Sequence, residues 1–530
     1  MNTHVPRTFR LSEGIDAYNP EITAEALQFF FLTNIEPRLG RLVTTRGYAS
    51  FQTAFGSSPF VGFSYYQLSN RQYSNLYAFT QTSVYWFDFK NGVFSTSPIY
   101  SSFPDTPDPY VFLPWYDALY VTKLYGGYLK LTRTVTEVLG GGVSGRYGVI
   151  ANSHAYLGGV SDGVSTEMAR VRWSDLDAPE DFVIDQSASE ADFFDLEPNN
   201  GQITGVSYQR SNTVIYTEHS IWVGSYVGYP GGFRHDPLFP GLGNIFHDSV
   251  VRAKEIDYFI GADNIYALNG FQPVPVGDKI FERFIADVVL TPAGGANTTS
   301  VRGYLDTRKN QVFWVYPSIS KTLWSIVFNY KENKWSERDP QQLTGWLDSP
   351  RVALRGYDVI NDIATTIDNV ATLIDDPAGG YPVLIPQLVG LRNAVTAGGS
   401  PIIGKVTDAY VKLDSTAFTH TLETTDFFFN DIAKVHEVVT VLLEFTGAAA
   451  PTIQLQVGAR DNQYDDIAWT VAKDINYTTG TYGFFIRNEG QGRLLRFRLT
   501  WANSAASFVT DLRQLSLVKV ESTTNANPEK

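Results

Sequence analysis

The chain of 530 residues lacks cysteine altogether and contains only 2 Met and 7 His. Without cysteine it has no disulfide framework, no thiolate zinc site and no cysteine nucleophile. The histidines are scattered, and neither the HExxH spacing of zinc enzymes nor a nucleotide-binding or nucleophile-elbow motif occurs. We therefore expect no metal, no cofactor and no catalytic residues.

An excess of basic residues and a long apolar run are also missing. Lys and Arg number 41 against 55 Asp and Glu, which gives a formal net charge of −14. This balance argues against a general nucleic-acid binder, because such proteins need a basic footprint. No apolar run approaches the roughly 18–20 residues of a membrane span, and we expect neither a membrane span nor a secretory signal.

Aromatic residues are abundant. The 10 Trp, 30 Tyr and 35 Phe amount to 14% of the chain, and aromatic residues favour β-strands. In addition, 44 Gly and 26 Pro interrupt the sequence at short intervals, as residues of turns do. The composition predicts an all-β protein.

A pattern of two short aromatic strands separated by a turn recurs between residues 61 and 345. The pattern occurs six times, and its intervals bracket the roughly 40–50-residue period of propeller blades. The central aromatic residues of the six copies are Tyr77, Tyr120, Tyr156, Tyr216, Phe259 and Phe313. We predict an irregular β-propeller of six to seven blades, with most of the aromatic side chains packed between blades.

The remaining regions are predicted to differ from the propeller. Residues 1–60 are expected to form an N-terminal arm and the first strands. Residues 346–405 break the pattern and predict a linker or extended loop, with a short helix near Ile363–Ile374 and a possible closing blade. Period-two alternation returns in residues 406–530, which predicts an added C-terminal β-sandwich.

Nine carboxylates follow one another between residues 175 and 197 without a single Lys or Arg. They are Asp175, Asp177, Glu180, Asp181, Asp185, Glu190, Asp192, Asp195 and Glu197. A solvated loop between strands is the simplest interpretation. A glycosidase would need two carboxylates roughly 5–10 Å apart beside aromatic platforms, which Trp173, Phe182, Phe193 and Phe194 could supply. A cation site is a third interpretation, and the sequence leaves all three open.

Several segments resemble, in the same order, motifs of one family. They are the arm Arg38-Leu39-Gly40-Arg41 through Arg46-Gly47-Tyr48, then Arg170–Phe182 (RVRWSDLDAPEDF), Val274–Phe281 (VPVGDKIF), Phe328–Ser336 (FNYKENKWS), Leu422–Phe427 (LETTDF) and Gly492–Arg498 (GRLLRFR). Together they resemble the tail nozzle proteins of tailed bacteriophages, also called tail hub or packaged-DNA stabilisation proteins. The chain departs from the family pattern at Thr425, where the family commonly has Gly, and at Leu494-Leu495.

The resemblance implies a structural virion protein of the phage tail, made in the host cytoplasm, with no enzymatic activity. It implies a propeller with an added β-rich domain, assembled as a ring, commonly a homohexamer, below the portal and adaptor proteins. Such a ring closes the DNA channel, retains packaged DNA, carries tail fibres, a spike or a needle, and lets double-stranded DNA pass on ejection. A host-surface polysaccharide-binding or -degrading tail protein and a cellular propeller scaffold are the alternatives.

Two charged features acquire candidate roles in such a ring. A DNA duplex carries one charge per about 1.7 Å of its axis, so an acidic wall would repel it and let it slide. The acidic segment is therefore a candidate for a loop that faces the DNA channel. Arg38, Arg41 and Arg46 are candidates for docking on an acidic surface of the portal or adaptor, although ordinary surface charge explains them equally well.

Overall fold

The computed structural model describes most of the chain, and nearly all of its elements are strands. The two helical elements among the described residues are short, η1 (Pro198–Asn200) and α1 (Phe281–Asp287). The described residues are 2–3, 7–9, 11, 14–16, 29–38, 41–45, 48–53, 60–67, 74–88, 93–106, 108–116, 118–132, 136–139, 142–185, 187–270, 272–289, 301–321, 323–340, 343–352, 385–392, 402–406, 417–428, 434–448, 451–462, 465–476, 480–485, 491–504 and 508–524. No helix within these ranges is long and apolar enough to cross a membrane.

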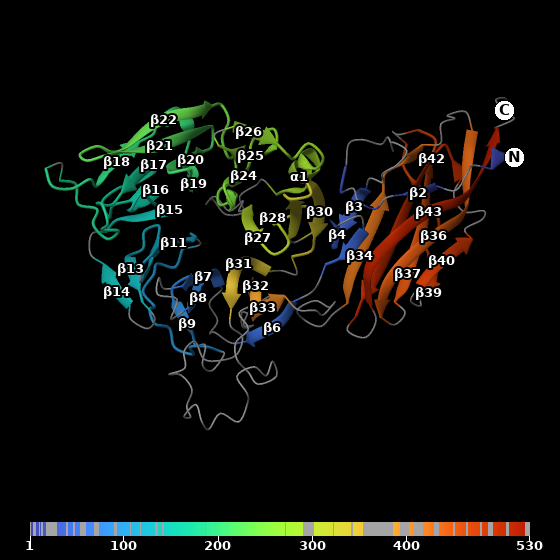
Figure 1. The fold of residues 1–530 in the computed structure, drawn as a ribbon, viewed down its shortest axis with the longest axis horizontal. Coiled ribbons are helices and arrows are strands. Elements are labelled where there is room, and N and C mark those ends of the chain that lie inside the picture. Colours follow the sequence, from blue (N-terminus) through green and yellow to red (C-terminus); the bar gives the residue numbers. More distant parts are fainter. Residues whose placement is uncertain are drawn as a thin grey trace, which may run out of the picture.

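Seven groups of four antiparallel strands form a ring of blades in the described part of the chain (Figure 1). Each of the first six blades takes four strands that follow one another in sequence. Blade one has β7 (Phe60–Gln67), β8 (Ser74–Thr80), β9 (Val84–Asp88) and β10 (Val93–Phe94), and blade two has β11 (Tyr110–Trp115), β12 (Ala118–Lys123), β13 (Tyr128–Leu131) and β14 (Thr136–Leu139). Blade three has β15 (Ser144–Ala151), β16 (His154–Ser161), β17 (Thr166–Trp173) and β18 (Asp192–Asp195), and blade four has β19 (Ile203–Gln209), β20 (Asn212–Thr217), β21 (Ser220–Gly228) and β22 (Gly232–Pro240). Blade five has β23 (Val251–Ala253), β24 (Ile256–Ile260), β25 (Ile265–Asn269) and β26 (Gln272–Pro275), and blade six has β27 (Arg302–Asp306), β28 (Gln311–Tyr316), β29 (Trp324–Asn329) and β30 (Lys334–Arg338).

The predicted all-β fold and β-propeller are confirmed. The six strand pairs predicted from the sequence are the second and third strands of blades one to six. The six central aromatic residues lie on the second strands, and each is at most 3% exposed. Because the first strands of neighbouring blades contact one another, they line the axis, and the fourth strands lie at the outer rim.

Blade seven closes the ring with a strand from the beginning of the chain. It contains β31 (Leu343–Val352), β32 (Ile385–Arg392), β33 (Ile402–Val406) and, as its outermost strand, β6 (Tyr48–Thr53). Strand β31 also contacts β7 of blade one, so the first and last blades meet. The region expected as a linker therefore supplies three strands, and the helix expected near residues 363–374 lies outside the described residues.

Two further sheets lie beside the propeller and combine N-terminal with C-terminal strands (Figure 1). The first contains β3 (Phe29–Thr33), β34 (Phe418–Thr424), β35 (Phe427–Phe428), β37 (Thr452–Arg460), β38 (Ala468–Trp469), β39 (Lys473–Asn476) and β42 (Leu494–Asn503). The second contains β1 (Asn2–Thr3), β2 (Arg7–Phe9), β4 (Ile35–Arg38), β5 (Arg41–Thr44), β36 (Lys434–Ala448), β40 (Gly480–Phe485), β41 (Gln491–Gly492) and β43 (Phe508–Thr524).

The two sheets share one buried hydrophobic cluster with part of the propeller. Phe445 of the second sheet, for example, packs edge-on against Trp501 of the first, with ring centroids 6.1 Å apart. The first sheet continues into blade six, because β3 pairs with β30 on one side and with β34 on the other. The expected self-contained C-terminal sandwich is therefore not confirmed, and residues 1–60 supply strands to these sheets as well as to blade seven.

Candidate functional site

The nine-carboxylate segment comprises the connection from β17 to β18, the third and fourth strands of blade three, together with β18 itself and Glu197 just after it. It begins with a tight turn in which Asp175 and Ala178 form an isolated β-bridge. Because β18 is the outermost strand of its blade, the segment lies at the outer rim of the propeller, away from the propeller axis (Figure 1). A DNA channel bordered by this segment would therefore have to be formed between several subunits.

Glu190 is buried and anchors the segment to blade four. The hydroxyl of Tyr226 donates a hydrogen bond to Glu190 Oε2 at 2.9 Å, and His154 Nε2 lies 3.1 Å from the same oxygen. The other ring nitrogen of His154 lies 2.6 Å from the carbonyl oxygen of Asn152, so both ring nitrogens have a polar neighbour. The Trp173 indole donates to the Glu190 carbonyl at 2.7 Å. This carboxylate has a structural role.

Three further carboxylates satisfy backbone groups of the segment itself. Asp175 Oδ1 accepts a hydrogen bond from the amide of Glu190 at 2.7 Å, and Asp181 Oδ1 accepts from the amide two residues further along at 2.9 Å. Asp185 Oδ1 accepts from both the hydroxyl and the amide of Ser187, at 2.6 and 3.0 Å. These two bonds lower the pKa of Asp185, since they favour the ionised form. The segment therefore has a defined shape set by its own acids.

Asp195, on β18, forms the one bidentate ion pair of the segment among the described residues. Arg170 of β17 donates from Nε to Oδ1 at 2.6 Å and from Nη2 to Oδ2 at 2.8 Å. Asp195 raises the pKa of Arg170, mainly through the hydrogen bond. The acidic segment contains no Lys or Arg, and the arginine that pairs with Asp195 lies on the preceding strand, β17. Among the remaining acids, Asp177, Glu180 and Glu197 are exposed and Asp192 is half-buried.

The aromatic side chains that could have served as sugar platforms are mostly inaccessible. Trp173 and Phe182 are buried, and Phe194 stacks on His235 with ring centroids 4.6 Å apart. Phe193 is 40% exposed, but the guanidinium of Arg170 lies 4.3 Å from its ring centroid. A sugar ring needs an open aromatic face for stacking, so this arrangement gives the glycosidase interpretation little support.

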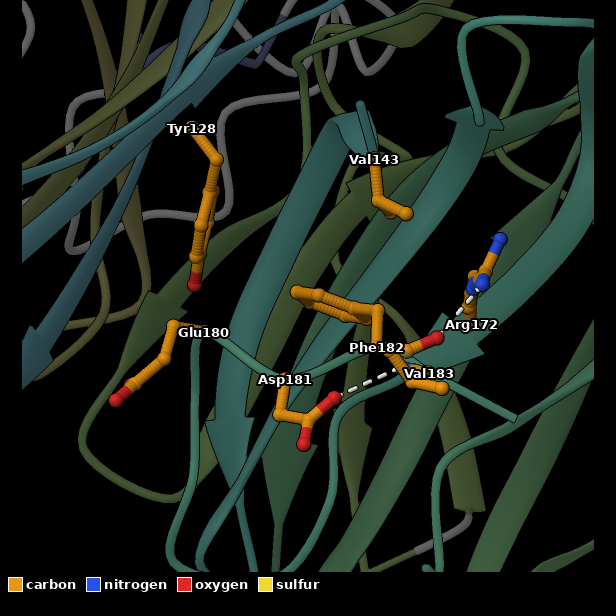
Figure 2. Close-up of a pocket in the computed structure, with 7 residues that line it drawn as sticks. All are labelled: Tyr128, Val143, Arg172, Glu180, Asp181, Phe182 and Val183. Carbon is orange, nitrogen blue, oxygen red and sulfur yellow. Dashed lines mark hydrogen bonds between the residues drawn. The ribbon is translucent and has the colours of Figure 1, made fainter. Parts of the chain in front are cut away.

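A pocket of about 170 Å³ lies between blades two and three beside the segment. Figure 2 shows Arg172 on one side of the Phe182 ring and Glu180 on the other. Arg172 donates from Nη2 to the Phe182 carbonyl at 2.7 Å, and Glu180 accepts a hydrogen bond from the Tyr120 hydroxyl at 3.1 Å. Burial lowers the pKa of Arg172. The pocket thus presents an arginine and carboxylates on separate walls, and the sequence prediction had overlooked Arg172.

No group of three or more His, Asp or Glu side chains that could hold a metal ion occurs in the described ranges. Several histidines are instead core residues with hydrogen-bond partners. His235 lies 2.6 Å from the Tyr156 hydroxyl, His247 lies 2.7 Å from the Tyr147 hydroxyl, and His420 Nδ1 donates to the Asn34 carbonyl at 2.8 Å. Burial lowers the pKa of each of these three histidines to about 4.

The predicted docking arginines lie on a hairpin that joins the second C-terminal sheet. Arg38 of β4 pairs directly with Arg41 of β5, and both side chains are exposed. Arg46 lies outside the described residues. Strand β5 pairs in turn with β43, Asp511 opposite Val43 and Leu512 opposite Leu42, and Arg513 follows directly after the last paired residue, on the side of Arg41. Sequence reasoning missed Arg513, because only the strand pairing brings it next to residues almost 500 positions earlier.

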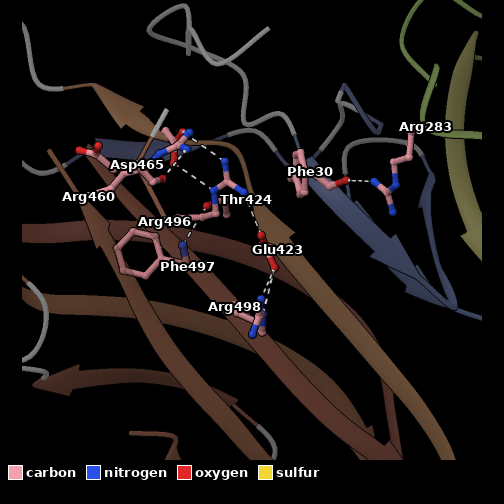
Figure 3. Close-up of polar contacts among 10 residues, drawn as sticks. Phe30, Arg283, Glu423, Thr424, Arg460, Asp465, Arg496, Phe497 and Arg498 are labelled. Carbon is pink, nitrogen blue, oxygen red and sulfur yellow. Dashed lines mark hydrogen bonds and ion pairs between the residues drawn. The ribbon is translucent and has the colours of Figure 1, made fainter. Parts of the chain in front are cut away.

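An ion-pair network joins the two C-terminal segments that carry the family resemblance (Figure 3). Arg496 donates from Nη1 to Glu423 Oε1 at 3.0 Å, and from Nε and Nη2 to the two oxygens of Asp426 at 3.0 and 3.1 Å. Arg498 forms a second pair with Glu423, and Arg460 a second pair with Asp426. The strand register places Glu423 opposite Arg498, so the sheet itself aligns the network.

The same network touches the strand that joins the C-terminal sheets to the propeller. The guanidinium of Arg496 lies 4.5 Å from the ring centroid of Phe30 on β3, and the Phe30 carbonyl accepts a hydrogen bond from Arg283 of α1 (Figure 3). Arg283 also pairs with Glu337 of β30 at 2.6 Å. Asn34, next to β3, donates to the Thr419 carbonyl at 2.7 Å. Buried charges and strand pairing therefore fix the propeller and the C-terminal sheets to each other.

Comparisons with known proteins identify similar solved structures but no family. No protein-family model and no curated protein matches the chain. Among solved structures, the chain is similar to the WD40 domain of Pan2 from Neurospora crassa, with 8% identity over 68% of this chain and 96% of that domain, at a TM-score of 0.37. It is also similar to an auxiliary nutrient binding protein from Bacteroides thetaiotaomicron, with 13% identity over 55% of this chain and 75% of that protein, at a TM-score of 0.30. A third match, with 10% identity, is the Cps50 (Swd1) β-propeller domain of Myceliophteria thermophila, over 51% of this chain and 83% of that domain, at a TM-score of 0.30.

Proposed function

We propose that the chain is a structural protein of a bacteriophage tail, which forms the nozzle or hub ring below the portal and adaptor. The ring closes the DNA channel, retains packaged DNA, carries fibres, a spike or a needle, and lets double-stranded DNA pass on ejection. One observation carries the proposal. Four of the six segments that resemble the family contact each other in two pairs, although the members of each pair lie about 50 to 70 residues apart in the sequence.

The first such contact joins the VPVGDKIF and FNYKENKWS segments. The Trp335 indole donates a hydrogen bond to the Val276 carbonyl at 2.8 Å, and Trp335 itself is buried. Gly277, the residue after Val276, has no room for a side chain, because an added Cβ would lie 2.6 Å from Asn264 Oδ1. The second contact is the network of Arg496 and Arg498 with Glu423 and Asp426. In both contacts the residues that carry the resemblance bind each other, which supports the resemblance.

Within the RVRWSDLDAPEDF segment, three motif residues hold the acidic loop in place. Arg170 pairs with Asp195, Arg172 binds the Phe182 carbonyl, and Trp173 binds the Glu190 carbonyl. The motif thus serves to shape the loop that follows it. A motif that shapes a loop instead of assembling a reactive site favours a structural protein over an enzyme.

The exposed carboxylates of the segment remain candidates for a surface that repels passing DNA. We expect that replacing Asp177, Asp185 and Glu197 by their amides slows DNA exit in an ejection assay or leaves it unchanged, since a less acidic wall repels phosphates less. The amide substitutions keep the shape of each side chain. Faster exit from the variant virions would contradict this role.

Location and assembly test the proposal as a whole. We expect images of virions to show the protein as a ring on the tail axis between the adaptor and the distal tail. We also expect the purified assembly to have about six times the mass of the 59.0 kDa chain. A trimer with activity on host-surface glycans would instead favour the polysaccharide alternative, and absence of the protein from virions would refute both. Arg38 and Arg41 remain candidates for docking on an acidic protein surface, that of the portal or adaptor in the sequence-based prediction.

A further inference from the structure

We propose that the arginines of the β4–β5 hairpin and β43 bind the acidic end of blade three of a second copy of this chain. The arginine row is Arg38, Arg41 and Arg513, on three adjacent strands. The blade-three face is formed by Leu176, Glu180, Asp181, Val183 and Ile184 of the acidic segment, with the neighbouring turn of blade four. The inference rests on the proposed ring, for which it names the contact between subunits.

The arginine row is held on one face of a sheet. Residues directly opposite each other in antiparallel strands point to the same side, as Arg38 and Arg41 do. Arg513 is the residue of β43 that follows Leu512, the partner of Leu42, so it comes next to Arg41 on the adjacent strand. Adjacent strands are about 4.8 Å apart, which makes the row about 10 Å long. Its neighbours Leu42 and Leu512 are buried, whereas all three arginines are exposed. The sheet thus presents the three charges outward as a group.

Like charges placed directly opposite each other destabilise a sheet. The ion pair found at the row joins Arg41 to Asp511, at 3.5 Å, with the Arg41 side chain 44% exposed. One carboxylate cannot balance three guanidinium groups. An acidic protein surface docked on the row would offset the repulsion, and arginine is the residue best suited to paired contacts with carboxylates.

The blade-three face offers carboxylates together with exposed apolar side chains. Glu180 and Asp181 border the pocket of Figure 2, and around them Leu176, Val183 and Ile184 are 43%, 69% and 40% exposed. Tyr229 of blade four is 56% exposed and donates a hydrogen bond to the Ser187 carbonyl at 2.9 Å, which joins the two loops. Exposed aliphatic side chains gain nothing from facing DNA phosphates. Apolar groups rimmed by charge are typical of a protein contact.

Charge complementarity and position favour a second copy as the occupant. The chain as a whole is acidic, so a second copy would be repelled unless it presented a basic surface, and the arginine row is such a surface. Strands β17 and β18 lie at one end of the molecule and β43 at the other (Figure 1). A contact between different surfaces of identical chains is heterologous, and such contacts close into rings when the rotation between subunits permits. The pocket, about 170 Å³ in volume, is large enough to admit an arginine head group beside Glu180 and Asp181.

Charge reversal tests the contact on the full chain. One variant carries Arg41→Glu and Arg513→Glu, a second carries Glu180→Lys and Asp181→Lys, and a third carries all four substitutions. We expect the wild type to associate in a concentration-dependent way by sedimentation velocity. Each two-residue variant should associate at least ten-fold more weakly, because like charges then face each other. The four-residue variant, and an equimolar mixture of the two-residue variants, should associate again, since each contact then pairs opposite charges.

A charge reversal at an arginine outside the row serves as the control. Arg234, on β22, is an arginine with a 71% exposed side chain that pairs with Asp236, and Arg234→Glu should leave association unchanged. A wild-type chain that stays monomeric at the highest concentration reached would overturn the proposal. So would association that none of the reversals weakens, or loss of portal or adaptor binding in the arginine variant without loss of self-association. Virion images test the proposed function separately, so a ring seen in virions whose contacts survive both reversals would overturn this inference alone.

Discussion

Replacing Arg496 by Met should destabilise the C-terminal sheets strongly. The Arg496 side chain is 7% exposed, and its partners Glu423 and Asp426 are 3% and 1% exposed. Met fills much of the volume but leaves both carboxylates without their shared cation. Breaking a buried ion pair by removing one partner costs about 3–5 kcal/mol. Because Arg498 and Arg460 still contact the two carboxylates, we expect a loss near the lower end, about 3 kcal/mol.

The matched control is the same substitution at Arg170. Its pair with Asp195 has the same bidentate geometry, but Asp195 is 52% exposed. Exposed ion pairs contribute about 0–1 kcal/mol, so Arg170→Met should cost less than 1 kcal/mol. The two pairs have the same chemistry, and the Arg170 pair has the shorter hydrogen bonds, so a larger loss at Arg496 follows from burial and from its second carboxylate.

Native-state hydrogen exchange is the suitable assay, because the chain is large and its parts need not unfold together. Amide protons of β34 and β42 should lose protection in Arg496→Met by the amount of the local destabilisation, which is about a hundred-fold faster exchange for 3 kcal/mol. Amide protons of blade three should keep their rates. Equal effects of the two substitutions, or a change below 1 kcal/mol at Arg496, would refute the reasoning that buried carboxylates depend on this arginine.

Three further outcomes follow from the structure. Acidification from pH 6.5 towards pH 4 should destabilise the protein, because buried His420 has a pKa of about 4 and its imidazole therefore binds a proton at higher pH in the unfolded state. The loss of folding free energy from this group approaches about 3 kcal/mol. His420→Gln should accordingly make the denaturant midpoint depend less on pH. Gly232→Ala should lower the melting temperature, since Gly232 has a φ of +59° and an added Cβ would lie 2.4 Å from Trp173 Nε1; unchanged melting would contradict the close approach. Deleting residues 1–53 removes β6 and should leave blade seven open and sensitive to protease, whereas deletion of residues 1–10 should spare the blades.

Much of the propeller could be predicted from the sequence, because each of the first six blades is local. Their second and third strands are consecutive, aromatic and separated by short turns, so Tyr77 or Tyr216 marks a blade without any knowledge of distant residues. Blade seven could not be predicted in this way. Its outermost strand, β6, precedes its neighbour β33 by about 350 residues, and no periodicity records such a pairing.

For the candidate site, the sequence alone shows only that acidic residues are concentrated in one segment. The run of acids from Asp175 to Glu197 is visible in the sequence, but its division into buried, paired and exposed members depends on His154 and Arg170, which lie on other strands. The arginine row is a similar case. Arg38 and Arg41 stand out in the sequence, whereas Arg513 joins them only because β43 pairs with β5. Contacts across strands decide which charges act together, and these contacts are set by the fold.

The pairing of β1 and β2 with β43 has a consequence for how the protein is made. Asn2 lies opposite Ser522, and Phe9 lies opposite Leu515, so these strands find their partners only after about 500 further residues have been synthesised. Blade seven likewise waits for β33 before β6 can close it. Contacts of such large sequence separation form slowly, so blade seven and the second sheet are completed later than the six local blades. A truncated product would keep several open strand edges, and it would not offer a finished surface to another subunit.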